Sequence, residues 1–425
     1  MIRFVLTFVC AFAVLSEAAA GSSGALRDST LRTDWVLARA GGEPQVYLHS
    51  MSRYPGWAGR THHPDSLFLA GNGTVTLRDT LTGRVLYTNS FSTLFSEWLT
   101  LPECEGQPRS FETTLLTPLP AVPAWIDVAV TSARRDTIAS ARMLYSPSDL
   151  LVADAIRPRL EQRTLHCGGD PARAIDVVIL AEGYIAAEAD SFFHHAAVAA
   201  REILGYAPFS DSADRFNFTA LFTPSRDSGV SIPAEHRWAD TAFGSHFHTF
   251  YSERYLTTPH VWRLHDAAQA VPYEHIIVLA NTPHYGGGGI YNNYTLTAAR
   301  HPDFRPVVVH EFGHSFGGLA DEYFYDDDVM EDTYPTDVEP WERNITTLCD
   351  FTGKWESLLP DGTPVPTRPA DMGRYPVGVY EGGGYSARGV YRPAFECRMR
   401  NNSYPVFCPG CVLALRRLID FYTAP

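Results

Sequence analysis

The chain has 425 residues, enough for two or three domains, and 45% of them are hydrophobic. This composition excludes a largely disordered protein, because it supplies enough apolar surface to form packed cores. The formal net charge of −14 argues against nucleic acid or an anionic membrane surface as the main partner, so we expect no nucleic-acid partner.

The N-terminus has the pattern of a secretory signal peptide. A short positively charged start is followed by an apolar run from Phe4 to Leu15 and by small residues up to Ala20. The run is shorter than the roughly 20 residues that span a bilayer. We therefore expect a signal peptide over residues 1–20, with a membrane anchor or a buried helix as the alternative. The protein is then exported, whether secreted, periplasmic or at the cell surface, with no membrane span in the mature chain.

Six cysteines follow the expected signal peptide. They are Cys104, Cys167, Cys349, Cys397, Cys408 and Cys411. An even number in an exported chain predicts disulfides, although the sequence does not choose their pairing. Cys408 and Cys411 are separated by Pro and Gly and could form a tight disulfide, a redox pair or half of a structural zinc site. Export favours the disulfide.

Short strands and turns fill the chain from Trp35 to about Ala141. Residues 74–77 and 85–87 flank a turn at 81–83, and residues 125–130 run apolar or alternate. Frequent Gly and Pro separate these segments, which predicts an all-β sandwich over residues 30–145. No cluster of titratable side chains there indicates catalysis.

The pattern changes after a connection over residues 143–172. Residues 175–180 and 276–279 read as buried strands, and residues 186–204 as a helix. Residues 413–421 are expected to form a closing helix. Strands alternating with helices predict an α/β or α+β catalytic domain over residues 165–425.

Residues 307–316 carry the strongest chemical pattern of the chain. Pro306 suits the first turn of a helix, and the glycines at 317 and 318 suit its end. In a helix, His310 and His314 lie four residues apart on one face, so both imidazoles can reach one zinc ion. Glu311 is offset around the helix and can reach a water on the metal.

This arrangement predicts hydrolysis of a protein or peptide substrate. Zinc lowers the pKa of a bound water towards about 7 and polarises a carbonyl. Glu311 would accept the proton of that water and pass it to the leaving amine. The predicted catalytic residue is therefore Glu311, and the predicted cofactor is zinc.

The third metal ligand is expected shortly after the helix. The usual position for a ligand, three residues after Gly317, is occupied by Ala320, which cannot bind metal. Asp321 is the preferred ligand and Glu322 the alternative, since a carboxylate oxygen can bind zinc. The acidic tract 326–328 reads as a solvated loop, with a calcium site as the less favoured interpretation.

The segment His310 to Tyr323, HEFGHSFGGLADEY, resembles the signature of the IgA-peptidase family of zinc metallopeptidases. Residues 176–184, 208–210, 215–218, 228–230 and 285–294 are also similar to family segments. The resemblance extends from about residue 30 to the C-terminus. It implies a zincin-like, metzincin-related catalytic domain preceded by a β-rich domain, and a zinc endopeptidase activity. It does not imply that IgA is the substrate.

Other segments suggest supporting roles. The glycine-rich stretch 286–293 could be an edge strand that pairs with an extended substrate, or a flexible surface loop. Residues 375–392, rich in Tyr and Gly, are a second candidate for substrate specificity. Met399 could form a hydrophobic floor beneath the metal or be plain core packing. The candidates for a transition-state hydrogen-bond donor are Tyr323, Tyr385, Tyr391 and Arg392.

The sequence as a whole predicts an exported zinc-dependent endopeptidase. One alternative is a non-catalytic surface-binding or adhesive protein with a structural zinc site. Glu311 argues against it, because a structural site does not need this residue and is normally closed by four protein ligands. A zinc hydrolase that acts on non-peptide amides is a third possibility.

Overall fold

The computed structural model describes residues 24–324 and 333–424. The expected signal peptide and the acidic tract at 326–328 lie outside the described residues. Among the helices of the described part, none has the length and apolar character that a bilayer span requires.

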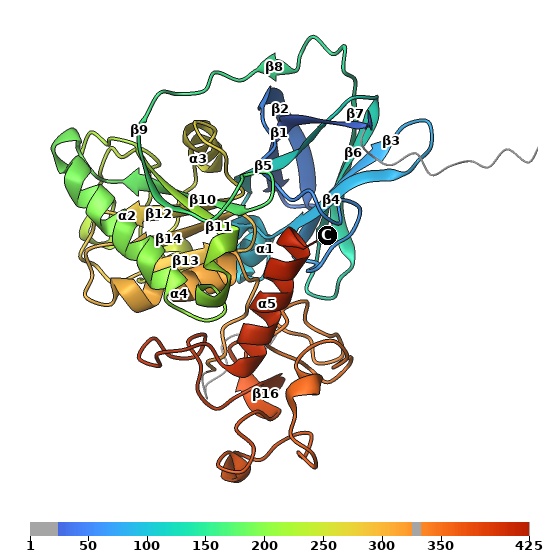
Figure 1. Cartoon of the computed structure of the whole chain (residues 1–425), viewed down its shortest axis with the longest axis vertical. Helices are drawn as coiled ribbons and strands as arrows, with labels where there is room; N and C mark the ends of the chain where they lie inside the picture. The colour runs from blue at the N-terminus through green and yellow to red at the C-terminus, as the bar shows by residue number, and fades with distance from the viewer. Residues whose placement is uncertain (1–23, 325–332, 425) are drawn as a thin grey trace, which may run out of the picture.

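Two four-stranded sheets form the N-terminal part of the chain (Figure 1). One sheet has the order β5-β1-β2-β8 and the other the order β4-β3-β6-β7. The strands are β1 (Leu26–Arg39), β2 (Gln45–Pro55), β3 (Gly73–Asp79), β4 (Val85–Phe91), β5 (Arg109–Pro120), β6 (Ala124–Thr131), β7 (Thr137–Tyr145) and β8 (Ala153–Asp154). Side chains from both sheets share one hydrophobic core. In β6 buried and partly exposed residues alternate, which is the pattern of a strand that faces a core on one side. The β-rich character expected here is confirmed.

A six-stranded sheet with the order β13-β14-β12-β10-β11-β9 forms the centre of the second part. Its strands are β9 (Glu161–Cys167), β10 (Ile175–Glu182), β11 (Phe216–Phe222), β12 (His275–Ala280), β13 (Gly287–Ile290) and β14 (Tyr294–Ala298). The four inner strands are parallel, and β9 and β13 are antiparallel edges. All eight residues of β10 are buried, as expected for an apolar run inside a parallel sheet.

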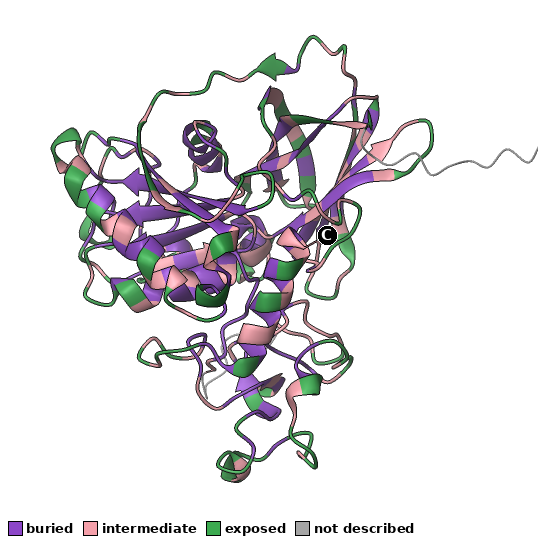
Figure 2. Cartoon of the chain, in the orientation of Figure 1, coloured by how far each residue is buried: buried purple, intermediate pink, exposed green. Residues whose placement is uncertain are grey.

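Helices cover both faces of this sheet (Figures 1 and 2). On one face α2 (Ala189–Leu204) and α4 (Phe304–Ser315) contact each other and the strands. On the other face lies α3 (Val261–Ala268). The C-terminal part adds a small sheet of β15 (Tyr380–Gly383) and β16 (Ser386–Arg392), and then α5 (Pro409–Thr423). The strands predicted at 175–180 and 276–279 correspond to β10 and β12, and the helices predicted at 186–204, 307–316 and 413–421 correspond to α2, α4 and α5, with ends that differ by a few residues. The connection predicted at 143–172 is only partly correct, because it contains the end of β7 and the whole of β8 and β9. As a largely exposed edge strand, β9 has no apolar pattern.

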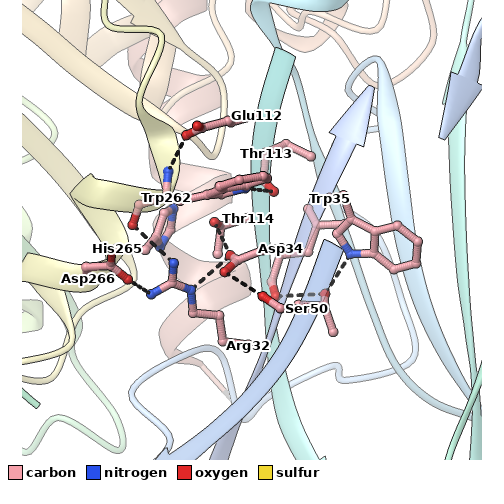
Figure 3. Close-up of polar contacts among 12 residues, drawn as sticks. Arg32, Asp34, Trp35, Ser50, Glu112, Thr113, Thr114, Trp262, His265 and Asp266 are labelled. Atoms are coloured by element: carbon pink, nitrogen blue, oxygen red, sulfur yellow. Dashed lines mark hydrogen bonds and ion pairs between the residues drawn. The ribbon is translucent and has the colours of Figure 1, made fainter. Parts of the chain in front are cut away.

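The two parts contact each other through polar groups around the buried side chain of Arg32 (Figure 3). Arg32 of β1 donates to Asp34 Oδ1 (2.9 Å) and to Asp266 Oδ1 of α3 (2.6 Å). Its remaining nitrogen donates to the carbonyl oxygen of Trp262 (3.1 Å), and the backbone N–H of Trp262 donates to Glu112 Oε2 (3.0 Å). Because the Arg32 side chain is almost fully buried, these contacts fix α3 against the first sheet.

The predicted disulfides are absent from the described residues, where all six cysteines are free thiols. The Sγ atoms of Cys397 and Cys411 are 3.7 Å apart, whereas a disulfide bond is about 2.05 Å long. Cys167 and Cys349 are exposed. The prediction was wrong because an even number of cysteines says nothing about which of them approach each other in the fold.

The buried Asp176 predicts a pH-dependent stability. Burial raises its pKa to about 7, although Asn217 donates to Oδ1 (2.9 Å); among the described residues Oδ2 has no hydrogen-bond partner. Since the folded-state pKa lies above the unfolded value, stability should fall as the pH rises from about 4 through 7. Each unit of pKa shift corresponds to about 1.4 kcal/mol. We expect Asp176→Asn to melt at a higher temperature than the wild type at pH 8 and to lose this advantage at pH 4, as measured by thermal unfolding. The exposed Asp214→Asn is the control; an equal effect at both pH values would contradict the prediction.

Candidate metal centre

The helix α4 carries the two histidines of the predicted site. It begins at Phe304, contains Pro306 in its first turn and ends at Ser315. The chain then turns back at Gly318, whose φ of 56° lies in the left-handed region that favours glycine. This turn brings Asp321 back to the helix.

Three side chains place one ligand atom each around a common point. The Nε2 atoms of His310 and His314 are 3.0 Å apart. Asp321 Oδ1 lies 3.1 Å from the first Nε2 and 3.3 Å from the second. Ligands at about 2.0–2.1 Å from a tetrahedral zinc ion stand about 3.3 Å from each other. The spacing of the three atoms therefore fits zinc.

Hydrogen bonds to other residues orient the three candidate ligand side chains. His310 Nδ1 donates to the carbonyl oxygen of Arg398 (3.0 Å), and His314 Nδ1 donates to that of Leu319 (2.6 Å). These bonds leave both Nε2 atoms as the acceptors that a metal requires. The Tyr385 hydroxyl donates to Asp321 Oδ2 (2.5 Å), while the buried Oδ1 receives no hydrogen bond and faces the imidazoles. A buried carboxylate oxygen that faces two imidazole nitrogens without accepting a hydrogen bond is further support for a cation at this point.

The imidazole and carboxylate groups of the centre shift each other's pKa values. Burial lowers the pKa of His314, but Asp321 outweighs it and raises the pKa to about 9. Burial would raise the pKa of Asp321, but His314 and His310 hold it well below its usual range. The carboxylate is thus kept ionised and favours positive charge between the imidazoles, which a divalent cation can provide.

Glu311 lies beside the three candidate ligand residues, against β13. Burial raises its pKa, and the neighbouring His310 and His314 act in the opposite direction. A Cβ atom at Gly287 would lie 2.9 Å from Glu311 Oε1, and one at Gly289 would lie 2.2 Å from the carbonyl oxygen of Glu311. The glycines therefore let the strand pass directly over the helix.

Residues 287–290 of the glycine-rich stretch form the edge strand β13 and the residues after them form a turn, but the outer edge of β13 is partly occupied. The N–H of Gly287 donates to the carbonyl oxygen of Arg254 (3.3 Å), and Leu256 donates to that of Gly287 (3.5 Å). An extended substrate cannot pair at Gly287 while these bonds exist. Substrate pairing stays a prediction for the residues that follow.

Met399 lies beneath α4. A Cβ atom at Gly313 would lie 2.8 Å from its Sδ, so the absence of a side chain there allows the close packing. Met399 is fully buried, and its carbonyl oxygen accepts the N–H of Glu322 (2.8 Å). Met399 thus packs in the core against the helix that carries the two histidines, and its role as a floor beneath a metal stays a prediction. The carbonyl oxygen of the preceding residue, Arg398, accepts the Nδ1 proton of His310.

The four candidate donors are not equally placed. Tyr385 reaches the centre but uses its hydroxyl on Asp321. The ring of Tyr323 lies 5.3 Å from that of Tyr385. Arg392 donates to the carbonyl oxygens of Glu381 and Gly382, away from the ligands. Tyr391 pairs through its backbone with Thr346. Tyr385 is therefore the candidate donor with a hydrogen bond to a candidate ligand residue, Asp321.

Sequence reasoning missed one acidic residue near the centre. Glu97 lies in α1 (Leu94–Trp98), between the strands of the N-terminal part, and accepts the Tyr255 hydroxyl (2.5 Å). Burial raises its pKa to about 7, and it interacts electrostatically with His314 and Asp321. Nothing in the local sequence marks a single glutamate in a β-rich segment as part of a site formed by distant residues.

Two family models match the chain in consecutive order. The model of the peptidase M64 N-terminus matches residues 23–142, and the model described as IgA Peptidase M64 matches residues 164–375. The second match contains all three residues grouped around the candidate metal position. No curated protein matches the chain.

Proposed function

The chain belongs to the IgA peptidase M64 family, and from this premise we propose that it is an exported, zinc-dependent endopeptidase. The membership makes it a peptidase that acts on protein. The observation that supports a metal mechanism is the approach of three ligand atoms to within 3.3 Å of each other on His310, His314 and Asp321, with Glu311 beside them. We also propose a signal peptide at 1–20, an N-terminal β domain at 30–145 and a zincin-like catalytic domain at 165–425.

The proposed mechanism assigns a role to each residue. When bound, zinc supplies a Lewis acid that acidifies water and polarises the substrate carbonyl. His310 and His314 present Nε2 because backbone carbonyls hold their Nδ1 protons. Asp321 completes the ligand set, oriented by the Tyr385 hydroxyl. Glu311 accepts the proton of the attacking water and delivers it to the leaving amine.

The arrangement favours catalysis over a purely structural metal. The group contains three ligand residues among those described, which leaves a fourth position for water or substrate. A structural zinc site is normally closed by four protein ligands. The alternative of a non-catalytic binding protein is therefore less well supported.

Metal removal tests the proposal. We expect 1,10-phenanthroline to abolish cleavage of a quenched peptide library and added zinc to restore it, because without the cation nothing activates the water. Zinc content is measured in parallel by mass spectrometry of the metal, and circular dichroism controls for unfolding. Undiminished cleavage by fully metal-free, folded protein would contradict the proposal.

A further inference from the structure

A second group of potential metal ligands lies next to the catalytic centre. It consists of Glu322, Cys397, Cys408 and Cys411, each offering one ligand atom within 4.8 Å of the others. All four residues are buried, with at most 2% of their surface exposed. They come from the turn after α4, from the segment that carries Met399 and from the start of α5. None of them belongs to the histidine centre described above.

The distances fit a tetrahedral ion better than a disulfide. The Sγ atoms of Cys397 and Cys411 are 3.7 Å apart. With metal–sulfur bonds of about 2.3 Å, two sulfurs of a tetrahedral zinc site stand about 3.8 Å apart. Glu322 Oε1 lies 3.0 Å from the sulfur of Cys411 and 3.8 Å from that of Cys408. These values bracket the roughly 3.5 Å expected between an oxygen and a sulfur ligand on one ion.

The surroundings of the group are incomplete without a cation. The side chain of Glu322 receives one amide hydrogen bond, from Asn344 to Oε1 (3.0 Å), and its Oε2 is buried without a partner. No Lys or Arg forms an ion pair with this carboxylate in the described part of the chain. The nearby Arg392 donates from Nη1 to the backbone carbonyl oxygens of Glu381 and Gly382. A buried carboxylate in this state is costly unless a positive charge compensates it.

The local backbone also favours thiolates. Cys408 is the N-cap residue of α5, and Cys411 lies in its first turn. The positive end of a helix of 15 residues stabilises negative charge at both positions. In addition, the backbone N–H of Cys408 donates to the sulfur of Cys397 (3.2 Å). Such a bond stabilises a thiolate ligand.

From these observations we infer that Glu322, Cys397, Cys408 and Cys411 bind a second metal ion, for which zinc is the best fit. Three thiolates select a soft cation, and four protein ligands form the closed set of a structural site. Glu322 directly follows Asp321, and its N–H is bound to Met399. The ion would therefore join the segment that carries the catalytic Asp321 to the segment that holds His310 through Arg398. Glu322 is a ligand of this second ion and not of the first.

Metal counting with site-specific variants tests the inference. The full chain, purified under reducing conditions, should contain about two zinc atoms. His310→Ala should retain about one, and the double variant Cys408→Ser/Cys411→Ser should also retain about one. The controls Cys167→Ser and Cys349→Ser change exposed thiols outside the group and should leave the count unchanged.

Cobalt substitution shows which ligands hold the ion. Cobalt bound by thiolates gives an intense charge-transfer absorption in the near ultraviolet, whereas a site of imidazole and carboxylate does not. We expect this band in the wild type and in His310→Ala, and its loss in the cysteine double variant. The His310→Ala result decides the matter even if the cysteine variant fails to fold, because it leaves the group untouched.

Two outcomes would overturn the inference. One is a cobalt-loaded wild type without the thiolate band. The other is a protein isolated without reductant that contains a disulfide within the group, detected as a mass two hydrogens lower. If instead only the thiolate site fills, the inference stands and the proposed peptidase centre fails, so the two proposals can be separated.

Discussion

Replacing Glu311 with Gln should lower kcat by roughly 10²- to 10⁴-fold while leaving the zinc content unchanged. Gln has nearly the same shape as Glu but cannot accept the proton of the attacking water. The residue is not among the three grouped ligands, so metal binding should survive the change. Cleavage of a quenched peptide is measured together with bound zinc.

The matched control is Glu356→Gln, since Glu356 is exposed and lies outside the centre. This variant should cleave as fast as the wild type. Wild-type kcat in Glu311→Gln at full zinc occupancy would exclude Glu311 as the base. Loss of zinc from this variant would instead show that the carboxylate contributes to metal binding.

Replacing Asp321 with Asn should weaken zinc binding at the histidine pair by at least about 100-fold. The change removes the negative charge that faces both imidazoles at 3.1 and 3.3 Å. Loss of an outer-shell partner already costs roughly 10- to 100-fold in metal affinity, and loss of a charged ligand should cost more. The affinity is obtained by adding zinc to metal-free protein and following the return of cleavage. This readout is insensitive to zinc bound elsewhere in the chain.

Glu322→Gln is the informative comparison, because the sequence left this residue as the alternative ligand. Its carboxylate faces the cysteine group and not the histidines. The zinc concentration that restores half of the activity should therefore change much less than in Asp321→Asn. The opposite ranking of the two variants would reverse the assignment of the third ligand.

The sequence was most informative where the chemistry depends on local spacing. The ends of the helix around His310 and His314 were predicted within a few residues. Residues four apart lie on the same face of a helix, so their spacing alone brings the two imidazoles together. Buried strands such as β10 were predicted from continuous apolar runs. Local signals of this kind do not depend on the rest of the fold.

Contacts between distant segments were not predictable. Glu97, Tyr255 and Tyr385 reach the centre only because segments far apart in the sequence converge there. The cysteines are the clearest case: their number suggested disulfides, yet the fold brings three of them to a carboxylate one residue beyond the predicted ligand. The edge strand β9 was missed because an exposed strand carries no apolar pattern.

The most direct measurement is a crystal structure of the zinc-loaded protein with anomalous differences collected on both sides of the zinc absorption edge. A zinc-specific peak should lie about 2.0–2.2 Å from His310 Nε2, His314 Nε2 and an Asp321 oxygen, with Glu311 beside its open position. Fully zinc-loaded crystals without a peak between these three residues would contradict the account.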